Sequence, residues 1–207
     1  MKRLLIALLL LVALLLPACS ADESVYIQTD PGNPVLIETE TMDDSTHAIT
    51  TISVPHHKVH EGEMYSVSQN GDLSNGASQD TLIITPDSTI WAHLTISIET
   101  EAEASYIFYE SANITDPGAS ITPVNRNRNS TNTSVLFISY NATVADPGTP
   151  LHREHWGTSK SRGGEERSEQ EWVLKQNASY ILRVTNETTS ENYISTVLIW
   201  YEHEDLE

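Results

Sequence analysis

The 207-residue chain contains one cysteine, Cys19, so no disulfide can form within it. Basic residues are scarce as well, because 11 Lys and Arg stand against 29 Asp and Glu, giving a formal net charge of -18. Such an acidic surface repels phosphate groups, so we expect no binding to nucleic acid. The acidity is typical of a soluble surface, or of one that attracts cations or a basic partner.

The sequence also lacks common catalytic signatures. The patterns Gly-x-Ser-x-Gly, Ser-x-x-Lys and His-Glu-x-x-His do not occur, and neither does a glycine-rich phosphate loop ending in Lys-Ser or Lys-Thr. Cys19 belongs to the leader described next, which excludes it as a nucleophile. We therefore predict a protein that is not an enzyme and that uses no metal or other cofactor.

The first 19 residues are typical of an export signal. Lys2 and Arg3 precede an apolar run from Leu4 to Leu16, which is too short to span a membrane comfortably but suits a signal peptide. The following Leu16-Pro17-Ala18-Cys19 resembles the lipobox of bacterial lipoproteins, in which the cysteine is lipidated. We expect membrane contact only through this signal or a lipid on Cys19; the alternative is an uncleaved N-terminal anchor helix.

Three regions follow from the pattern of residues: a signal helix over residues 1–19, a polar tether over 20–45 and one β domain over 46–207. The tether contains Asp30-Pro31-Gly32-Asn33-Pro34, which interrupts both helix and sheet, and a possible short strand at Val35–Ile37.

From about Thr46 the sequence indicates β structure. β-branched and aromatic stretches alternate with turn residues such as Asn70-Gly71-Asp72, Asn75-Gly76 and Pro86-Asp87, and no stretch shows helical periodicity. The pattern predicts an all-β fold, a single antiparallel β-sandwich of jelly-roll type with eight or nine strands. The expected strands are residues 47–54, 63–68, 80–85, 89–99, 104–110, 134–143, 172–175, 180–186 and 193–202.

The longest segment without a strand pattern runs from Asp146 to Glu171 and contains several glycines and basic residues. Loops of this length are usually functional or mobile. We predict that it is mobile and that it contacts a protein partner through Arg153, Trp156, Lys160 and Arg162. The alternatives are that Trp156 folds back onto the sandwich and that the basic residues hold the loop against the protein's own carboxylates.

Histidines are the best candidates for a site. In an extended chain His56 and His60 lie on one face about 13 Å apart, at about 3.3 Å per residue, which is too far for one metal ion. His152 and His155 lie in the long loop, where they could adapt to a metal more easily. We expect all four to be solvated or hydrogen-bonded and not to bind metal.

Alternating acidic residues also occur at Glu99, Glu101 and Glu103. On a strand they would share one face, where they mark a solvent-facing edge or attract a cation. We expect the solvent-facing edge.

An ordered set of motifs extends from about Ile52 to the end of the chain. It comprises His56-His57-Lys58-Val59-His60-Glu61-Gly62-Glu63-Met64-Tyr65, Leu82-Ile83-Ile84-Thr85-Pro86, Trp91-Ala92-His93-Leu94, Asn125-Arg126-Asn127-Arg128-Asn129-Ser130, Trp172-Val173-Leu174-Lys175-Gln176-Asn177-Ala178-Ser179-Tyr180 and Trp200-Tyr201-Glu202-His203-Glu204-Asp205. Together they resemble small virion structural proteins of tailed bacteriophages, jelly-roll or sandwich modules that decorate capsids or sit in head fibres and tails.

The resemblance implies a non-enzymatic protein of the virion that binds a capsid or tail component and that can form homo-oligomers. In the Asn-Arg run the side chains are expected to bond to the backbone of an irregular loop, and Lys175-Gln176-Asn177 is expected to form a hairpin turn. The leader favours a second hypothesis, an exported, membrane-anchored lipoprotein of the cell surface that binds a ligand or partner.

Overall fold

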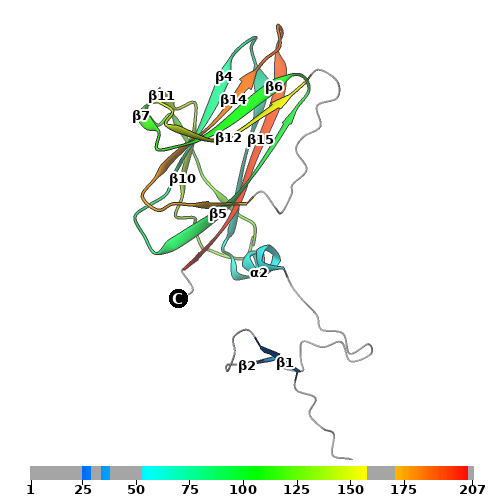
Figure 1. Ribbon diagram of the computed structural model, residues 1–207, viewed down its shortest axis with the longest axis vertical. Helices are drawn as coiled ribbons and strands as arrows, with labels where there is room; N and C mark the ends of the chain where they lie inside the picture. The colour runs from blue at the N-terminus through cyan, green and yellow to red at the C-terminus, as the bar shows by residue number, and fades with distance from the viewer. Residues whose placement is uncertain (1–24, 29–33, 38–52, 158–170, 205–207) are drawn as a thin grey trace, which may run out of the picture. The chain divides into compact units, whose positions relative to one another are not determined.

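The computed structural model of the protein describes residues 25–28, 34–37, 53–157 and 171–204 (Figure 1). The chain divides into two compact units, Met1–Ile52 and Ser53–Glu207. In the first unit, β1 (Val25–Gln28) and β2 (Pro34–Ile37) form an antiparallel ribbon, and β2 includes the predicted short strand. The predicted signal helix lies outside the described residues. None of the described helices is long and apolar enough to cross a membrane.

The second unit is an antiparallel, all-β sandwich with one short helix, α2 (Val54–Glu61), which confirms the predicted class. One sheet has five strands, in the order β13 (Trp172–Leu174), β5 (Ile90–Thr100), β15 (Asn192–Glu204), β3 (Met64–Leu73) and β9 (Val124–Asn125). The other has six strands, in the order β12 (Thr149–Trp156), β6 (Ala104–Glu110), β14 (Ser179–Asn186), β4 (Ser78–Ile84), β10 (Phe137–Tyr140) and β8 (Ala119–Ile121). The expected eight or nine strands were therefore too few.

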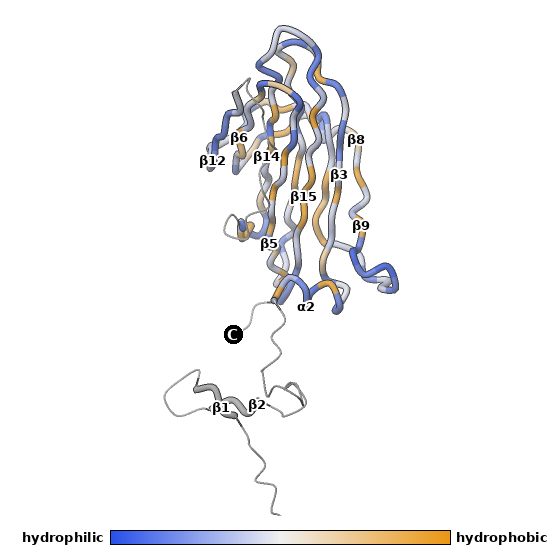
Figure 2. The backbone as a smooth tube through the Cα atoms, turned by 90° about the vertical axis from the view of Figure 1, so that its right-hand side faces the viewer, coloured by the Kyte–Doolittle hydropathy of each residue, from blue (hydrophilic) through white to orange (hydrophobic). Residues whose placement is uncertain are grey.

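The long strand β15 shows how the sequence builds the core. Successive side chains of a strand point to opposite faces, and β15 alternates between buried and more exposed residues from Asn192 to Glu202. Its inward side chains, including Leu198 and Trp200, pack with Phe108 and Tyr180 of the opposite sheet. Apolar residues accordingly recur along β15 and its neighbours β3 and β5 (Figure 2).

The chain crosses repeatedly between the two sheets. β3, β5, β13 and β15 belong to the five-stranded sheet, whereas β4, β6, β12 and β14 belong to the six-stranded sheet. From β3 to β6, and again from β12 to β15, each strand therefore lies in the other sheet from the strand before it. Between β6 and β12 the chain remains beside the six-stranded sheet or returns briefly to the edge of the other sheet at β9.

A two-stranded ribbon, β7 (Asn113–Asp116) and β11 (Thr143–Asp146), covers part of the outer face of the six-stranded sheet. Ile114 and Val144 of the ribbon, with Ala112 and Ala142 directly before its two strands, pack in a second apolar cluster with residues of β4, β6 and β14. The six-stranded sheet thus buries apolar side chains on both faces.

Each ribbon strand ends in the same turn, Asp116-Pro117-Gly118 or Asp146-Pro147-Gly148. In both turns the aspartate Oδ1 accepts a hydrogen bond from the glycine N–H, at 2.9 and 3.0 Å. Each glycine also lies against the backbone that precedes the other strand, because Gly118 contacts Tyr140 and Asn141 while Gly148 contacts Glu110 and Ser111. The ribbon is therefore a local structural repeat.

Three local predictions were wrong. Asn70-Gly71-Asp72 does not turn but continues β3, because these residues pair with the beginning of β15. The expected strand over residues 134–143 is divided at Asn141, whose φ of 56° interrupts an extended chain. The loop predicted from Asp146 contains β12, which pairs with β6 from Thr149 to Trp156.

One expectation about asparagine was confirmed and another only in part. Asn177 adopts a left-handed φ of 49° in the turn before β14, as a turn residue should. The expected hairpin at Lys175-Gln176-Asn177 was wrong, because β13 and β14 belong to different sheets and do not pair. The Asn-Arg run forms an irregular loop whose side chains bond backbone groups: Asn125 Nδ2 donates to the Gly62 carbonyl at 2.8 Å and Asn127 Nδ2 to the His60 carbonyl at 3.0 Å. This loop is thereby attached to the end of α2.

The substitution Gly148→Ala tests how closely the turn after β11 packs against the backbone before β7. Gly148 has a φ of 87°, and a Cβ there would overlap the backbone of Glu110 and Ser111. We expect the free energy of unfolding in urea to fall by roughly 3 kcal/mol, from left-handed strain and steric overlap together. Gly71→Ala is the control, because a Cβ at Gly71 meets no atom within 4 Å. Equal effects of the two substitutions would contradict this packing.

Candidate functional site

The candidate site lies on the outer face of the five-stranded sheet, where β5 and β15 pair. In this register Tyr201 is opposite His93, and His203 is opposite Trp91. Since residues two apart on a strand share a face, His93, Tyr201 and His203 all project from the side away from the core. The two histidines are diagonal neighbours across the strands.

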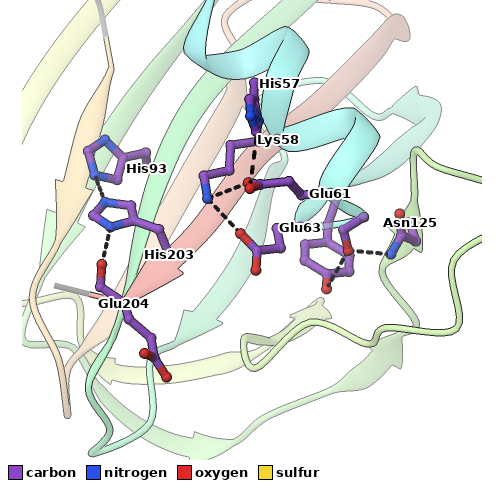
Figure 3. Close-up of polar contacts among 10 residues, drawn as sticks. His57, Lys58, Glu61, Glu63, His93, Asn125, His203 and Glu204 are labelled. Carbon is purple, nitrogen blue, oxygen red and sulfur yellow. Dashed lines mark hydrogen bonds and ion pairs between the residues drawn. The ribbon is translucent and has the colours of Figure 1, made fainter. Parts of the chain in front are cut away.

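The two imidazole rings face each other through their Nε2 atoms, which are 2.8 Å apart (Figure 3). His93 Nδ1 lies 2.6 Å from Glu171 Oε1 and 3.0 Å from the Tyr201 hydroxyl. His203 Nδ1 lies 2.6 Å from the backbone carbonyl oxygen of Glu204. Both Nδ1 atoms therefore have an oxygen partner, and the His93 ring also stacks on Tyr201 with centroids 4.5 Å apart.

Two cavities lie beside this pair. One, of about 400 Å³, is lined by His203, Tyr201 and Glu204, and by Lys58, Glu61 and others from the region of α2. The second, of about 290 Å³, is lined by His93, Glu171 and Tyr201 together with Pro55 and Met64 among others. The histidine pair is thus reachable from solvent on both sides of Tyr201.

Burial raises the pKa of Tyr201, and its hydrogen bond to Glu171 raises it further. A phenol with a raised pKa stays protonated at neutral pH and donates its hydrogen bond. Tyr201 therefore helps to hold the Glu171 carboxylate beside His93.

The strand end that carries His203 is fixed from the inside by a buried carboxylate. Glu202 is 5% exposed, and its carboxylate accepts hydrogen bonds from Ser134 Oγ, from the Val135 N–H and from Trp200 Nε1. A buried charge is costly unless it is hydrogen-bonded. These bonds satisfy Glu202 and join β15 to the segment before β10.

Helix α2 borders the larger cavity. The helix has the usual boundary residues, with Pro55 in its first turn and Gly62, whose φ is 74°, directly after its last turn. Lys58 lies 2.6 Å from Glu61 and 2.7 Å from Glu63 (Figure 3). Burial alone would lower the pKa of Lys58, but its hydrogen bonds to both carboxylates raise it. The hydrogen bond from Lys58 also lowers the pKa of Glu61.

The expectation that His56 and His60 are far apart was wrong. They lie on α2, where residues four apart are neighbours, and their Nε2 atoms are 3.0 Å from each other. The sequence indicated an extended chain here because the histidines follow a β-branched stretch. Both rings are exposed.

The other two candidate metal ligands, His152 and His155, lie apart from each other in the structure. On β12, His152 pairs with Phe108 and His155 with Ser105, so the two rings lie on opposite faces. His152 contacts the Tyr106 ring, whereas His155 Nε2 lies 3.2 Å from Glu103 Oε1.

The three alternating glutamates do not share a strand face. Glu99 lies on β5, while Glu101 and Glu103 lie in the turn between β5 and β6. The expectation of a common face was therefore wrong. Over the described part of the chain, no group of three or more His, Cys, Asp or Glu residues is arranged to hold a metal ion.

Of the predicted partner-contact residues, Arg153 is exposed on β12 and Trp156 is half-buried against Tyr106, with ring centroids 5.3 Å apart. Trp156 thus packs on the sandwich, the alternative that the sequence left open. Lys160, Arg162 and the predicted lipidation site Cys19 lie outside the described residues. Their roles stay predictions.

Sequence reasoning missed His93 and His203 as a pair. They are 110 positions apart, and only the register of β15 on β5 brings them together. The sequence offered one signal, which is that each histidine lies in a motif typical of a strand. These motifs are Trp91-Ala92-His93 and Trp200-Tyr201-Glu202-His203.

Comparison of the chain with protein-family models, with curated proteins and with solved structures found no match.

Tyr65 gives a pH-dependent test of the packing beneath the site. Its burial, with Glu202 and Glu63 nearby, raises its pKa to about 12 from 10.0. Because the folded protein binds the phenol proton more tightly, this stabilisation is complete below pH 10 and is lost as the pH approaches 12. We expect the free energy of unfolding to fall by roughly 2 kcal/mol more in the wild type than in Tyr65→Phe over this range.

Urea unfolding at several pH values measures this difference. Tyr193→Phe is the control, because Tyr193 is 39% exposed whereas Tyr65 is 2% exposed. If Tyr65→Phe and Tyr193→Phe changed the pH dependence equally, the account of Tyr65 would be wrong.

Proposed function

We propose that this protein is a non-enzymatic structural or decoration protein of a virion, a jelly-roll module that assembles on or adheres to a surface through its loops. The supporting observation is the interleaved strand order, β3-β15-β5-β13 in one sheet and β4-β14-β6-β12 in the other. Viral capsid domains are among the proteins that use such eight-stranded double-sheet folds. The ordered sequence motifs support the same proposal.

The surface offers several contacts for a protein partner from a capsid or tail. Large apolar side chains at least one-third exposed include Ile84 and Phe137, which lie directly opposite each other on β4 and β10. They adjoin the part of the six-stranded sheet that the ribbon covers. Arg153 adds a positive charge at the β12 edge of the same sheet on an otherwise acidic chain. We propose these residues, with Lys160 and Arg162, as partner contacts, or as contacts in a homo-oligomer.

Quantitative proteomics of purified particles tests the virion proposal. We expect the protein at many copies per particle, rising with particle purity alongside the major capsid protein. A cytoplasmic host protein followed through the same gradient is the control. Loss of the protein from the particle fraction at the rate of that control would exclude a virion component.

The leader supports a second candidate, an exported cell-surface lipoprotein that binds a ligand or partner with the same sandwich. The supporting residues are the apolar run from Leu4 to Leu16 and the cysteine three residues after it. Metabolic labelling with a palmitate analogue is expected to mark the wild type and Ser20→Ala but not Cys19→Ser. Equal label on Cys19→Ser and the wild type, or no label on either, would remove lipidation.

A further inference from the structure

We propose that His93 and His203 bind a divalent transition-metal ion such as Zn²⁺, with Glu171 and the backbone carbonyl of Glu204 orienting the two rings. The inference stands independently of the proposed function, because it rests on the hydrogen-bonding capacity of the two imidazoles and on their neighbours.

The protons of the two rings can be assigned from their partners. A carboxylate oxygen and a backbone carbonyl oxygen are acceptors only, so the contacts of 2.6 Å that they make require a proton on each Nδ1. A neutral imidazole carries one N–H, which leaves a lone pair on each Nε2. The two lone pairs then face each other across 2.8 Å.

Two such lone pairs repel at this distance unless a proton or a metal ion lies between them, and a metal ion can take the place of the proton. A Zn²⁺ ion binds imidazole nitrogen at about 2.0–2.1 Å, which places two ligands of a tetrahedral ion about 3.3 Å apart. The rings need to separate by only about half an ångström to reach that spacing. Metal-binding histidines commonly donate their second N–H to a carboxylate or a backbone carbonyl, as His93 and His203 do here.

The neighbourhood suits an ion with free coordination positions. The larger cavity beside His203 is also lined by Glu61, Glu63 and Glu204, and Lys58 pairs with the first two of these. No third histidine, cysteine or acidic ligand in the described residues completes the set. Water or a partner's ligand would therefore occupy the remaining positions. Imidazole nitrogen selects Zn²⁺, Cu²⁺ or Ni²⁺ over the hard ions Mg²⁺ and Ca²⁺.

The pair on α2 provides an internal comparison. His56 and His60 have similarly close Nε2 atoms, at 3.0 Å, but both rings are exposed. His93 is held by Glu171, by the Tyr201 ring and by β5, so less side-chain entropy is lost when it binds an ion. We therefore expect the His93–His203 pair on the sheet to bind the ion more tightly than the His56–His60 pair on α2.

Isothermal titration calorimetry of the full chain, without an affinity tag, with ZnCl₂ tests the proposal. We expect one tight site per chain, no comparable binding of Mg²⁺, and retention of the site in the double variant His56→Gln/His60→Gln. Affinity should fall at least tenfold in His93→Gln and in His203→Gln. Glu171→Gln, which alters a positioning residue, should weaken binding about tenfold, the lower end for a lost outer-shell partner. His155→Gln is the single-histidine control and should bind as the wild type.

A spectroscopic measurement on the wild type guards against variants that fail to fold. In ¹H–¹⁵N NMR spectra of the imidazoles, Zn²⁺ is expected to shift the Nε2 signals of two histidines before those of the α2 pair. Absence of Zn²⁺ binding, or binding that survives both His93→Gln and His203→Gln, would overturn the proposal. Loss of the tight site in His56→Gln/His60→Gln would overturn it as well. Unchanged affinity in Glu171→Gln would exclude the orienting role of Glu171.

Discussion

The alternation of side chains along β15 is the constraint on which both the core and the candidate site depend. β15 pairs with β3 on one edge and with β5 on the other, over nearly its whole length. Its inward residues include Trp200, which fills the core, and its outward residues include Tyr201 and His203. A slip of one residue would exchange these two sets. The same register therefore buries the tryptophan and places His203 beside His93.

Buried polar side chains fix the ends of the sandwich where strand pairing stops. At one end Glu202 accepts hydrogen bonds from Ser134, Val135 and Trp200. At the other, Asn186 is fully buried, and its Nδ2 donates to the carbonyls of Leu73, Ser74 and Ser190. Each of these side chains bonds to backbone groups of an irregular segment, which have no partner in a sheet. Such networks hold a loop in one arrangement when every member is satisfied.

The sequence was sufficient for what depends on local pattern. β-branched and aromatic stretches located strands such as β6 and β14, and Asn177 was recognised as a turn residue. β12 was missed because its one proline, its glycine neighbours and its charges are typical of a loop, while its strand form comes from pairing with β6. α2 was missed because eight residues give too short a helical period, although Pro55 and Gly62 are its ordinary boundaries. The histidine pair depends on the pairing of two strands that are far apart along the chain, and a single sequence does not specify that pairing.

The register of β15 on β5 is tested most directly by paired cysteines in a Cys19→Ser background, which has no other thiol. Ser97 and Val197 are directly opposite each other on these strands, whereas Ser195 is opposite Glu99. Directly opposed residues have Cβ atoms about 4.5–5.5 Å apart, close enough for a disulfide with a small adjustment. The structure predicts that Ser97→Cys/Val197→Cys oxidises readily in the folded protein and that Ser97→Cys/Ser195→Cys does not. Faster oxidation of the second pair would show that β15 is displaced by two residues, and His203 would then not lie beside His93.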